Sequence, residues 1–268
     1  MSTTAAAVEP QARADRERRF GGLGRLYGEQ ALPRLATRLA CVVGIGGVGS
    51  WAAEALARSG VGRLRLIDLD HIAESNINRQ IHALEPTLGQ AKVLAMRERI
   101  AAIDPAIEVE VVEDFLVPEN AERLLEGCDL VIDAIDNMRA KAAIVLACRA
   151  AKRPLVVCGA AGGKTDPARL KVDDLARTVQ DPLLSRLRRH LRTEHGFPRD
   201  PARRFGVLTV YSDEPPRLPS RSSESGPQGL NCAGYGSSMA VTASAGLFAA
   251  ARGLEALLAE RAPVKEGQ

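Results

Sequence analysis

The chain has 268 residues and a formal net charge of only +3, so its overall charge gives no indication of a nucleic-acid partner. An apolar fraction of 46% and a charged fraction of 26% are typical of a globular protein. A chain of this length buries roughly 70–75% of its unfolded surface and needs no disulfides for stability. Aromatic residues contribute only 3%, which predicts a core of Ala, Val, Leu and Ile.

Five dispersed cysteines are present, and none of them forms a CxxC pair. This spacing argues against zinc, and the odd count is typical of the reducing cytoplasm, so we expect a cytoplasmic protein. Cys41, Cys128, Cys148 and Cys158 lie in apolar runs and are interpreted as buried small side chains. The apolar tract 239–251 is short for a membrane span, so we interpret it as a buried helix and expect no membrane partner.

Strand and helix patterns alternate along the first 160 residues, after a polar start that continues into a helix. Strand patterns lie at residues 39–45, 64–68, 108–112, 130–135 and 155–158, and the near-continuous apolar run at 39–45 predicts a buried parallel strand. Helical patterns follow at residues 50–59, 89–103, 118–125 and 141–150. The alternation predicts an α/β fold, Rossmann-like and doubly wound, with a mainly parallel sheet and helices on both faces.

The alternation stops after residue 159. We predict loops over residues 159–175, a basic helix over 181–194, a mobile loop or crossover over 212–231, and a final Ala-rich helix. The basic helix carries Arg186, Arg188, Arg189 and Arg192. These arginines indicate either a solvated helix face or a surface that contacts the phosphates of a nucleic-acid backbone.

A GxGxxG motif at residues 44–49 directly follows the first strand and begins a helix. Its glycines are Gly44, Gly46, Gly47 and Gly49. Because backbone N–H groups at a helix N-terminus can approach a phosphate closely, this context favours nucleotide binding over a purely structural turn. Asp68 follows Gly49 by 19 residues and can accept hydrogen bonds from ribose hydroxyls, with Asp70 as the alternative.

Two cations, Arg79 and Lys92, follow the expected ribose carboxylate. A hydride-transfer enzyme does not need them there, whereas an enzyme that acts on a triphosphate uses cations to neutralise its charge. The alternative is a pair of solvated surface side chains. Asp136 ends a predicted strand, where it can hold Mg²⁺, whereas Asp133 lies within or under the sheet edge. The pattern favours ATP and makes an NAD-dependent dehydrogenase the less favoured alternative.

Residues 44–137 resemble the ubiquitin-activating-enzyme-like superfamily of adenylyltransferases, which includes the ThiF, MoeB and HesA proteins. The segments that carry the resemblance are GIGGVG (44–49), SNINRQ (75–80), GQAK (89–92) and IDN (135–137). The resemblance implies that the glycine loop, Asn76, Arg79 and Lys92 bind ATP phosphates. It also implies that Asp68 binds ribose and that Asp136 binds magnesium.

Further segments resemble the tRNA threonylcarbamoyladenosine dehydratase branch of this superfamily. They lie at residues 19–28, 78–84, 162–183 and 210–214, so the resemblance extends over about residues 19–254. It implies ATP-dependent dehydration of N6-threonylcarbamoyladenosine in tRNA, by adenylation of the threonine carboxylate and ring closure. The alternative within the superfamily is activation of the C-terminal glycine of a sulfur-carrier or ubiquitin-like protein. The missing CxxC pairs agree with the dehydratase, because many carrier activators hold zinc with two such pairs.

The resemblance implies further partners and regions. Superfamily members are commonly homodimers with an arginine supplied by the partner, for which Arg25 is the candidate and Arg19 the alternative. Cys232 aligns with a cysteine of the branch, where it either forms a transient acyl or persulfide adduct or packs in a tight turn. The resemblance leaves room for a sulfur-relay protein and a monovalent cation, and the 210–229 segment is shorter than in the branch. We predict a flexible start (1–18), an ATP-binding region (19–160), a C-terminal extension of the same domain for tRNA and dimer contacts (161–258), and a tail (259–268).

Overall fold

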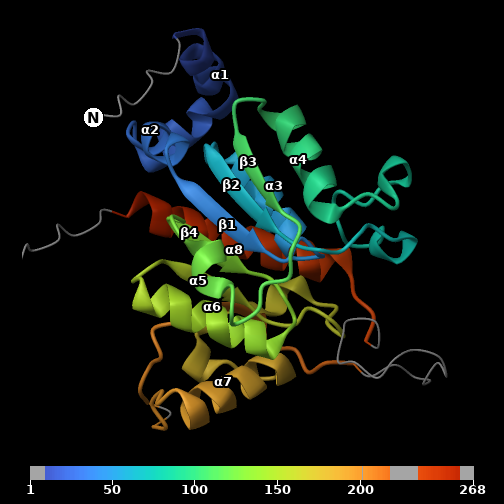
Figure 1. Cartoon of the computed structure of the whole chain (residues 1–268), viewed down its shortest axis with the longest axis vertical. Helices are drawn as coiled ribbons and strands as arrows, with labels where there is room; N and C mark the ends of the chain where they lie inside the picture. The colour runs from blue at the N-terminus through green and yellow to red at the C-terminus, as the bar shows by residue number, and fades with distance from the viewer. Residues whose placement is uncertain (1–9, 201, 218–234, 260–268) are drawn as a thin grey trace, which may run out of the picture.

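A mainly parallel β-sheet forms the middle layer of the protein (Figure 1). The structure, a computed structural model, describes residues 10–200, 202–217 and 235–259. Across these residues the sheet has seven strands in the order β3-β2-β1-β4-β5-β7-β6, and only β6 and β7 pair antiparallel. The strands are β1 (Leu39–Val43), β2 (Arg63–Ile67), β3 (Glu108–Val112), β4 (Leu130–Asp133), β5 (Leu155–Cys158), β6 (Leu170–Asp174) and β7 (Leu208–Ser212).

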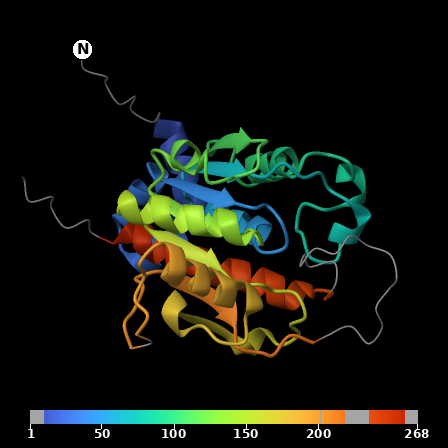
Figure 2. The ribbon, with the colours of Figure 1, turned by 60° about the horizontal axis from the view of Figure 1, so that its bottom comes forward.

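Helices cover both faces of the sheet, which confirms the predicted doubly wound α/β fold (Figures 1 and 2). They are α1 (Pro10–Tyr27), α2 (Ala31–Ala36), α3 (Gly49–Arg58), α4 (Lys92–Ile103), α5 (Ala121–Leu125), α6 (Met138–Ala150), α7 (Pro182–Glu194) and α8 (Met239–Leu258). One face packs against α3, α4 and α8, and the other against α5, α6 and α7.

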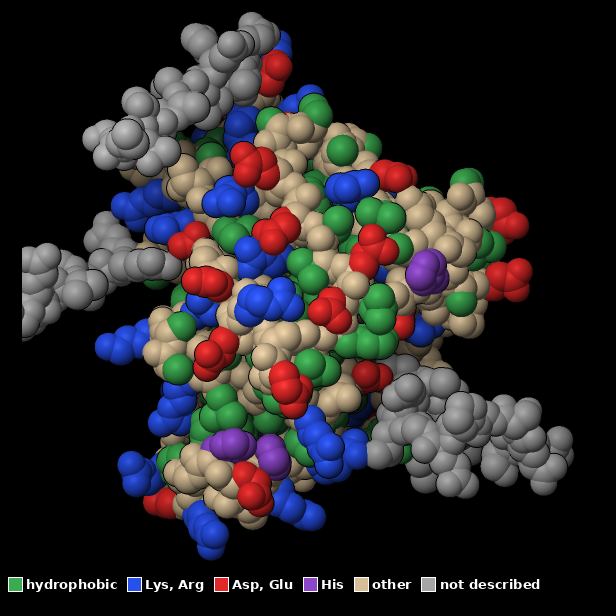
Figure 3. Space-filling view, in the orientation of Figure 1, with side chains coloured by type: hydrophobic (Ala, Val, Ile, Leu, Met, Phe, Trp, Pro, Cys, Tyr) green, Lys and Arg blue, Asp and Glu red, His purple; other side chains and the backbone are tan. Residues whose placement is uncertain are grey.

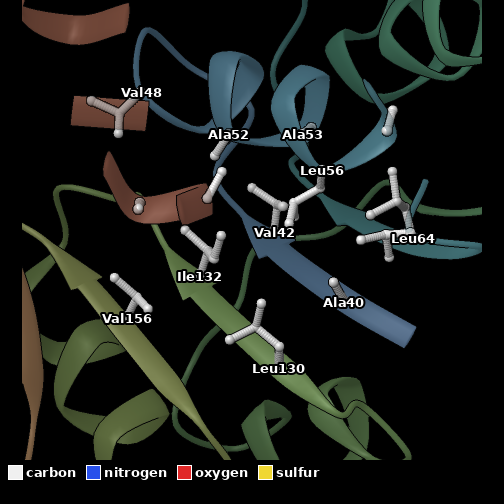
Figure 4. Close-up of a cluster of buried hydrophobic side chains, with 14 of the residues drawn as sticks. Ala40, Val42, Val48, Ala52, Ala53, Leu56, Leu64, Leu130, Ile132 and Val156 are labelled. Atoms are coloured by element: carbon white, nitrogen blue, oxygen red, sulfur yellow. The ribbon is translucent and has the colours of Figure 1, made fainter. Parts of the chain in front are cut away.

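Burial on both faces explains why β1 consists of consecutive apolar residues. Ala40 and Val42 point into the core beneath α3 and α8, while Cys41 and Val43 point into the core beneath α5 and α6. Figure 4 shows the first of these cores, where Val42 lies close to Leu56 of α3. Each fully buried Val or Leu side chain contributes roughly 1.5–3 kcal/mol, so these two cores fix the central strands.

Helix α8 packs closely against α3, because small residues let the two backbones approach each other. A Cβ atom at Gly246 would lie only 2.4 Å from the Val48 carbonyl oxygen. Among the described residues, α8 alone is long and apolar enough to cross a membrane by length and composition, and half of that stretch is buried. Its packing against α3, β4 and β5 confirms that the apolar tract forms a buried helix.

The prediction for the region after residue 159 was partly wrong. It placed a loop over residues 159–175, where β6 lies, and made no prediction for residues 195–211, where most of β7 lies. Edge strand β6 exposes Lys171, and β7 buries the polar residues Thr209 and Ser212, so neither has the continuous apolar run of a buried parallel strand. The basic helix is present as α7. The predicted mobile loop lies mostly outside the described residues, as does Cys232.

Candidate nucleotide-binding site

A cavity of about 680 Å³ lies at the carboxyl ends of the central strands. The strand order reverses between β1 and β4, and ligands of open α/β sheets bind in the crevice at such a switch point. Nine of the ten residues predicted to bind ATP line the cavity: Gly44, Gly46, Gly47, Asp68, Asp70, Asn76, Arg79, Lys92 and Asp136. The structure therefore brings together residues that are up to 92 positions apart in the sequence.

The glycines of the 44–49 loop have different structural tasks. Gly44 has a φ of +86°, a conformation that strains other residues. A Cβ at Gly49 would lie 1.8 Å from the Gly44 carbonyl oxygen, so Gly49 permits the turn itself without lining the cavity. A Cβ at Gly46 would meet no atom within 4 Å, which leaves open space beside the N-terminus of α3. This loop therefore fits a phosphate group.

Asp68 joins the end of β2 to the glycine loop. Its Oδ2 accepts a 2.6 Å hydrogen bond from the Ile45 amide, and its Oδ1 accepts one of 2.9 Å from the Asp70 amide. Burial raises the pKa of Asp68, although the charge of Lys92 and these hydrogen bonds oppose the rise. Since each carboxylate oxygen can accept a second bond, Asp68 retains capacity for a ribose hydroxyl.

Arg79 and Lys92 are held in place beside the glycine loop. The buried Lys92 Nζ lies 2.7 Å from Asp70 Oδ2. Arg79 Nη1 donates to the Ser75 carbonyl at 2.6 Å, and its stem crosses Gly47, where a Cβ would lie 3.2 Å from Arg79 Cγ. Both side chains line the cavity, so neither is a freely solvated surface cation.

Two carboxylates near the end of β4 have different environments. Asp136 is exposed and lines the cavity. Asp133 is fully buried and pairs with the buried Lys141 at 2.9 Å, and Lys141 also donates to the Cys158 carbonyl at 2.8 Å. Burial raises the pKa of Asp133, and Lys141 opposes that rise. Asp133 therefore lies under the sheet edge, where it ties β4 to α6 and, through Lys141, to β5.

Magnesium at this site would need ligands from outside the protein. Among the described residues, no group of three or more His, Cys, Asp or Glu could hold a metal ion. Mg²⁺ is commonly bound by one or two carboxylates together with substrate phosphates and water. Asp136 beside an open phosphate cradle fits that pattern.

Several cavity residues were not predicted from the sequence. Phe115, Leu116 and Val117 form an apolar wall after β3, and Phe115 is 56% exposed. Residues 159–162 and Lys164 follow β5 and line the opposite side of the cavity. Gly162 and Lys164 lie in the 162–183 segment that resembles the dehydratase branch, but the resemblance gave neither of them a role. The signal that could have indicated Phe115 is its position in a loop directly after a predicted strand, at the sheet edge where such strands place their ligands.

The four arginines of α7 divide into different environments. Arg188 donates to the Thr178 hydroxyl, and Arg192 donates from Nε to the Pro198 carbonyl at 3.1 Å with its guanidinium 5.2 Å from the Phe205 ring centroid. Arg189 is exposed, whereas Arg186 lines the cavity. In Figure 3, Lys and Arg side chains gather at the lower end of the molecule, over α7.

The candidate arginines of α1 lie away from the cavity of their own chain. Arg25 is exposed and does not line the cavity, and Arg19 donates from Nη1 to the Ile103 carbonyl at 2.7 Å. Both lie on the helix that Figure 1 shows near the amino end of β1, whereas the glycine loop follows its carboxyl end. Neither arginine therefore contributes to this cavity from within the same chain.

The four described cysteines are buried, which confirms the prediction from their apolar surroundings. Burial raises the pKa values of Cys148 and Cys158 to about 12. At such pKa values the thiols stay protonated near neutral pH, so these two side chains act as packing groups.

Comparison with known proteins agrees with this geometry. The model of the ThiF family matches residues 22–260. The tRNA threonylcarbamoyladenosine dehydratases of Haemophilus influenzae and Escherichia coli are 44% and 46% identical to this chain, and each match covers 91% of this chain and 95% of the relative. The E. coli dehydratase solved in complex with ATP has a TM-score of 0.82 at 45% identity, covering 90% of this chain and 94% of that one.

The chain therefore belongs to the ThiF family. The relatives match along nearly their whole length, so the agreement includes the region after β5 as well as the nucleotide-binding half. The resemblance to the dehydratase branch that the sequence motifs indicated is confirmed.

Proposed function

We propose that this protein is an ATP-dependent tRNA threonylcarbamoyladenosine dehydratase. It adenylates the threonine carboxylate of N6-threonylcarbamoyladenosine in tRNA and then closes the ring. The observation that carries the proposal is the single cavity, which joins a glycine phosphate cradle and two fixed cations to a second half over β4, β5 and β7. The dehydratase relatives, at 44% and 46% identity over 95% of their lengths, support the choice of substrate.

The nucleotide half has a defined part for each portion of ATP. The open space beside Gly46 receives phosphate, and Arg79 and Lys92 balance its charge. Asp68 is the better candidate for ribose, because Asp70 is already paired with Lys92. The apolar wall at residues 115–117 suits the adenine ring.

The reaction proceeds in two displacements. A carboxylate oxygen of the threonine group attacks the α-phosphorus, and pyrophosphate leaves. An atom of the carbamoyl-threonine group then attacks the activated carbonyl, AMP leaves, and the nucleoside has lost one water overall. Arg79 and Lys92 stabilise the charge that develops on the phosphates. Mg²⁺, when bound at Asp136, supplies further neutralisation of that charge. Ring closure is intramolecular, so holding the reacting groups close together accelerates it.

Further parts of the proposal concern partners. The exposed Arg189 on α7 and neighbouring basic side chains suit contacts with tRNA phosphates. The exposed Met239, Leu247 and Phe248 of α8 support a homodimer, in which Arg25 would be the arginine given to the partner's site. A sulfur-relay protein and a monovalent cation stay open expectations, and so does a cytoplasmic location.

The test uses purified protein with ATP, Mg²⁺ and tRNA that carries N6-threonylcarbamoyladenosine. After digestion of the tRNA, mass spectrometry should find an ATP-dependent loss of one water from the modified nucleoside. No mass change by a protein that binds ATP would contradict the proposal. It would favour activation of a protein ending in Gly-Gly, for which pyrophosphate exchange depends on that protein.

A further inference from the structure

The two halves of the cavity differ in their charged groups, because the nucleotide half combines the cations Arg79 and Lys92 with several carboxylates. Among the described lining residues, the carboxylates are Asp68, Asp70, Asp114 and Asp136, and they follow β2, β3 and β4. The half beyond β4 is formed by residues 159–162, Lys164, Pro182, Leu183, Arg186 and Pro216, and we call it the acceptor half. These lining residues include two cations and no carboxylate, so the acceptor half is complementary to an anion.

Lys164 gives the acceptor half a fixed positive charge. The side chain is 2% exposed, and its Nζ donates to the carbonyls of Gln180 at 2.9 Å, Ser212 at 3.5 Å and Glu214. Burial lowers the pKa of Lys164, and the nearby Asp181 and Glu214 carboxylates oppose that lowering. A neutral amine has only two hydrogens, so three carbonyl acceptors favour the ammonium form. These partners are uncharged, so no described ion pair neutralises the charge of Lys164.

The acidic side chains nearest to Lys164 are occupied by backbone amides. Asp181 accepts hydrogen bonds from the Ala160 and Leu184 amides at 2.8 and 3.0 Å. Glu214 accepts from the Thr165 and Asp166 amides at 2.9 and 3.0 Å. Both carboxylates therefore hold the loops of the acceptor half in place, and neither lines the cavity itself.

Arg186 is the cation of this half that remains available to a ligand. It lies on α7, whose first turn is capped by Asp181 and contributes Pro182 and Leu183 to the cavity. The one hydrogen bond that its guanidinium makes within the described residues is a 3.4 Å contact from Nε to the Pro182 carbonyl. Its two terminal nitrogens can therefore donate two parallel hydrogen bonds to a carboxylate, because the planar guanidinium matches the geometry of a carboxylate group.

We propose that Arg186 binds the threonine carboxylate of the modified nucleoside and presents it to the nucleotide half. The inference rests on the proposed function and adds the residue that recognises the reacting group. It separates Arg186 from Arg189, which lies on the same helix outside the cavity and suits the tRNA backbone. Lys164 positions the loops around the bound carboxylate and adds to the local positive potential.

The test compares binding of two tRNAs in the presence of an ATP analogue whose bridge between the α- and β-phosphates cannot be cleaved. One tRNA carries N6-threonylcarbamoyladenosine, and the other has the same sequence with unmodified adenosine. The wild type should prefer the modified tRNA, and Arg186→Ala should reduce this preference by roughly tenfold or more, as expected for a lost charge-assisted pair. Arg186→Lys should retain part of the preference. Arg189→Ala is the matched comparison and should weaken binding of both tRNAs equally.

Three results would overturn the inference: equal weakening of both tRNAs by Arg186→Ala, an unchanged preference, or a wild type that does not distinguish the tRNAs. Equal weakening would assign Arg186 to a backbone phosphate. Affinity for ATP should stay the same in Arg186→Ala, which verifies that the variant is folded. Failure of the proposed function is recognised separately, because the wild type would then remove no water from the modified nucleoside.

Discussion

Arg79 is the residue whose position is most closely tied to the chemistry. Its stem crosses Gly47, and within the described part of the chain its guanidinium bonds only to the Ser75 carbonyl and the Asn78 side chain. Arg79→Ala should therefore lower kcat/KM by on the order of 10²–10³, as for loss of a group that stabilises transition-state charge, with little change in stability. Pyrophosphate release measures the rate. Arg97→Ala removes an exposed arginine of α4 and is the control; full turnover by Arg79→Ala would refute the assignment.

His82 lies in the same loop but is shielded from the cavity. It is 2% exposed, and neither ring nitrogen has a hydrogen-bond partner among the residues that the structure describes. Burial, with Lys92 and Arg99 nearby, lowers the pKa of His82 from 6.5 to about 4. The folded protein thus disfavours the protonated ring, so the contribution of His82 to stability is complete above pH 6.5 and declines as the pH falls towards 4.

This linkage gives a testable pH dependence. Because of the lowered pKa of His82, the wild type should lose about 2 kcal/mol of unfolding free energy at this site between pH 7 and pH 5. His82→Leu should lack that loss while remaining folded. Urea unfolding measures the change in unfolding free energy between the two pH values for each protein. Subtracting one change from the other removes the contributions of the other titrating groups. Equal pH dependence of the two proteins would show that folding does not lower the pKa of His82.

At the scale of elements, the contact between α8 and α3 holds the start of α3 under the glycine loop. A Cβ at Gly246 would lie 2.4 Å from the Val48 carbonyl oxygen and 2.8 Å from Trp51 Cβ, which cannot easily move. At Gly253 the nearest atom is the side-chain Cδ2 of Leu130 at 2.6 Å, which can rotate away.

The two glycines of α8 should therefore respond differently to alanine. Gly246→Ala should destabilise the protein by roughly 1–3 kcal/mol through overpacking. Gly253→Ala should cost less, because the gain in helix propensity of about 1 kcal/mol offsets a softer contact. Urea unfolding compares the variants directly. Equal costs would mean that α8 can move relative to α3.

Helix α7 carries arginines with structural and binding tasks. Arg192 bonds to the Pro198 carbonyl and lies over Phe205, so Arg192→Ala should lower stability by about 1–2 kcal/mol. Replacing the exposed Arg189 by Ala should leave stability unchanged. It should reduce the slope of the logarithm of the tRNA binding constant against the logarithm of the salt concentration by roughly 0.7–0.9. Thermal unfolding and binding at several salt concentrations measure the two effects. If Arg189→Ala leaves the salt dependence of tRNA binding unchanged, Arg189 is a solvated surface side chain that does not contact tRNA.

At the scale of the whole molecule, the sequence predicted the parts of the fold in which one physical rule dominates. Buried parallel strands require continuous apolar runs, which made β1, β4 and β5 recognisable. Strands β2 and β3 alternate charged and apolar residues, which is the period of a partly exposed strand. Asp68, Arg79, Lys92 and Asp136 could be assigned to one site because the ends of parallel strands meet at one edge. Strand β6 has the sequence LKVDD and exposes Lys171, so it has no continuous apolar run that would have indicated a strand.

The acceptor half could not be predicted because its residues meet only through tertiary packing. Lys164 reaches carbonyls 16 to 50 positions away, and nothing in the sequence around it indicates those contacts. In the sequence, Arg186 could not be distinguished from the three other arginines of α7. The packing of α7 places it at the cavity. The sequence showed which residues carry charge, and the fold determined which charge faces a ligand.

A ligand that binds only the folded protein stabilises the whole fold, so ATP and NAD can be compared by how much each raises Tm. A larger effect of ATP distinguishes the proposed enzyme from an NAD-dependent dehydrogenase. With Mg²⁺ present, ATP at a hundred times the dissociation constant of ATP should stabilise the protein by about 2.7 kcal/mol. Each kcal/mol of stabilisation should raise Tm by roughly 2–4 °C. NAD at the same concentration should have a much smaller effect.

Gly46→Val is the informative variant, because its side chain would fill the open space beside the phosphate cradle without meeting protein atoms within 4 Å of its Cβ. It should keep the Tm of the free protein and lose the increase with ATP. An equal shift with NAD would instead favour the dehydrogenase, and a full ATP response in Gly46→Val would place the phosphates elsewhere in the cavity.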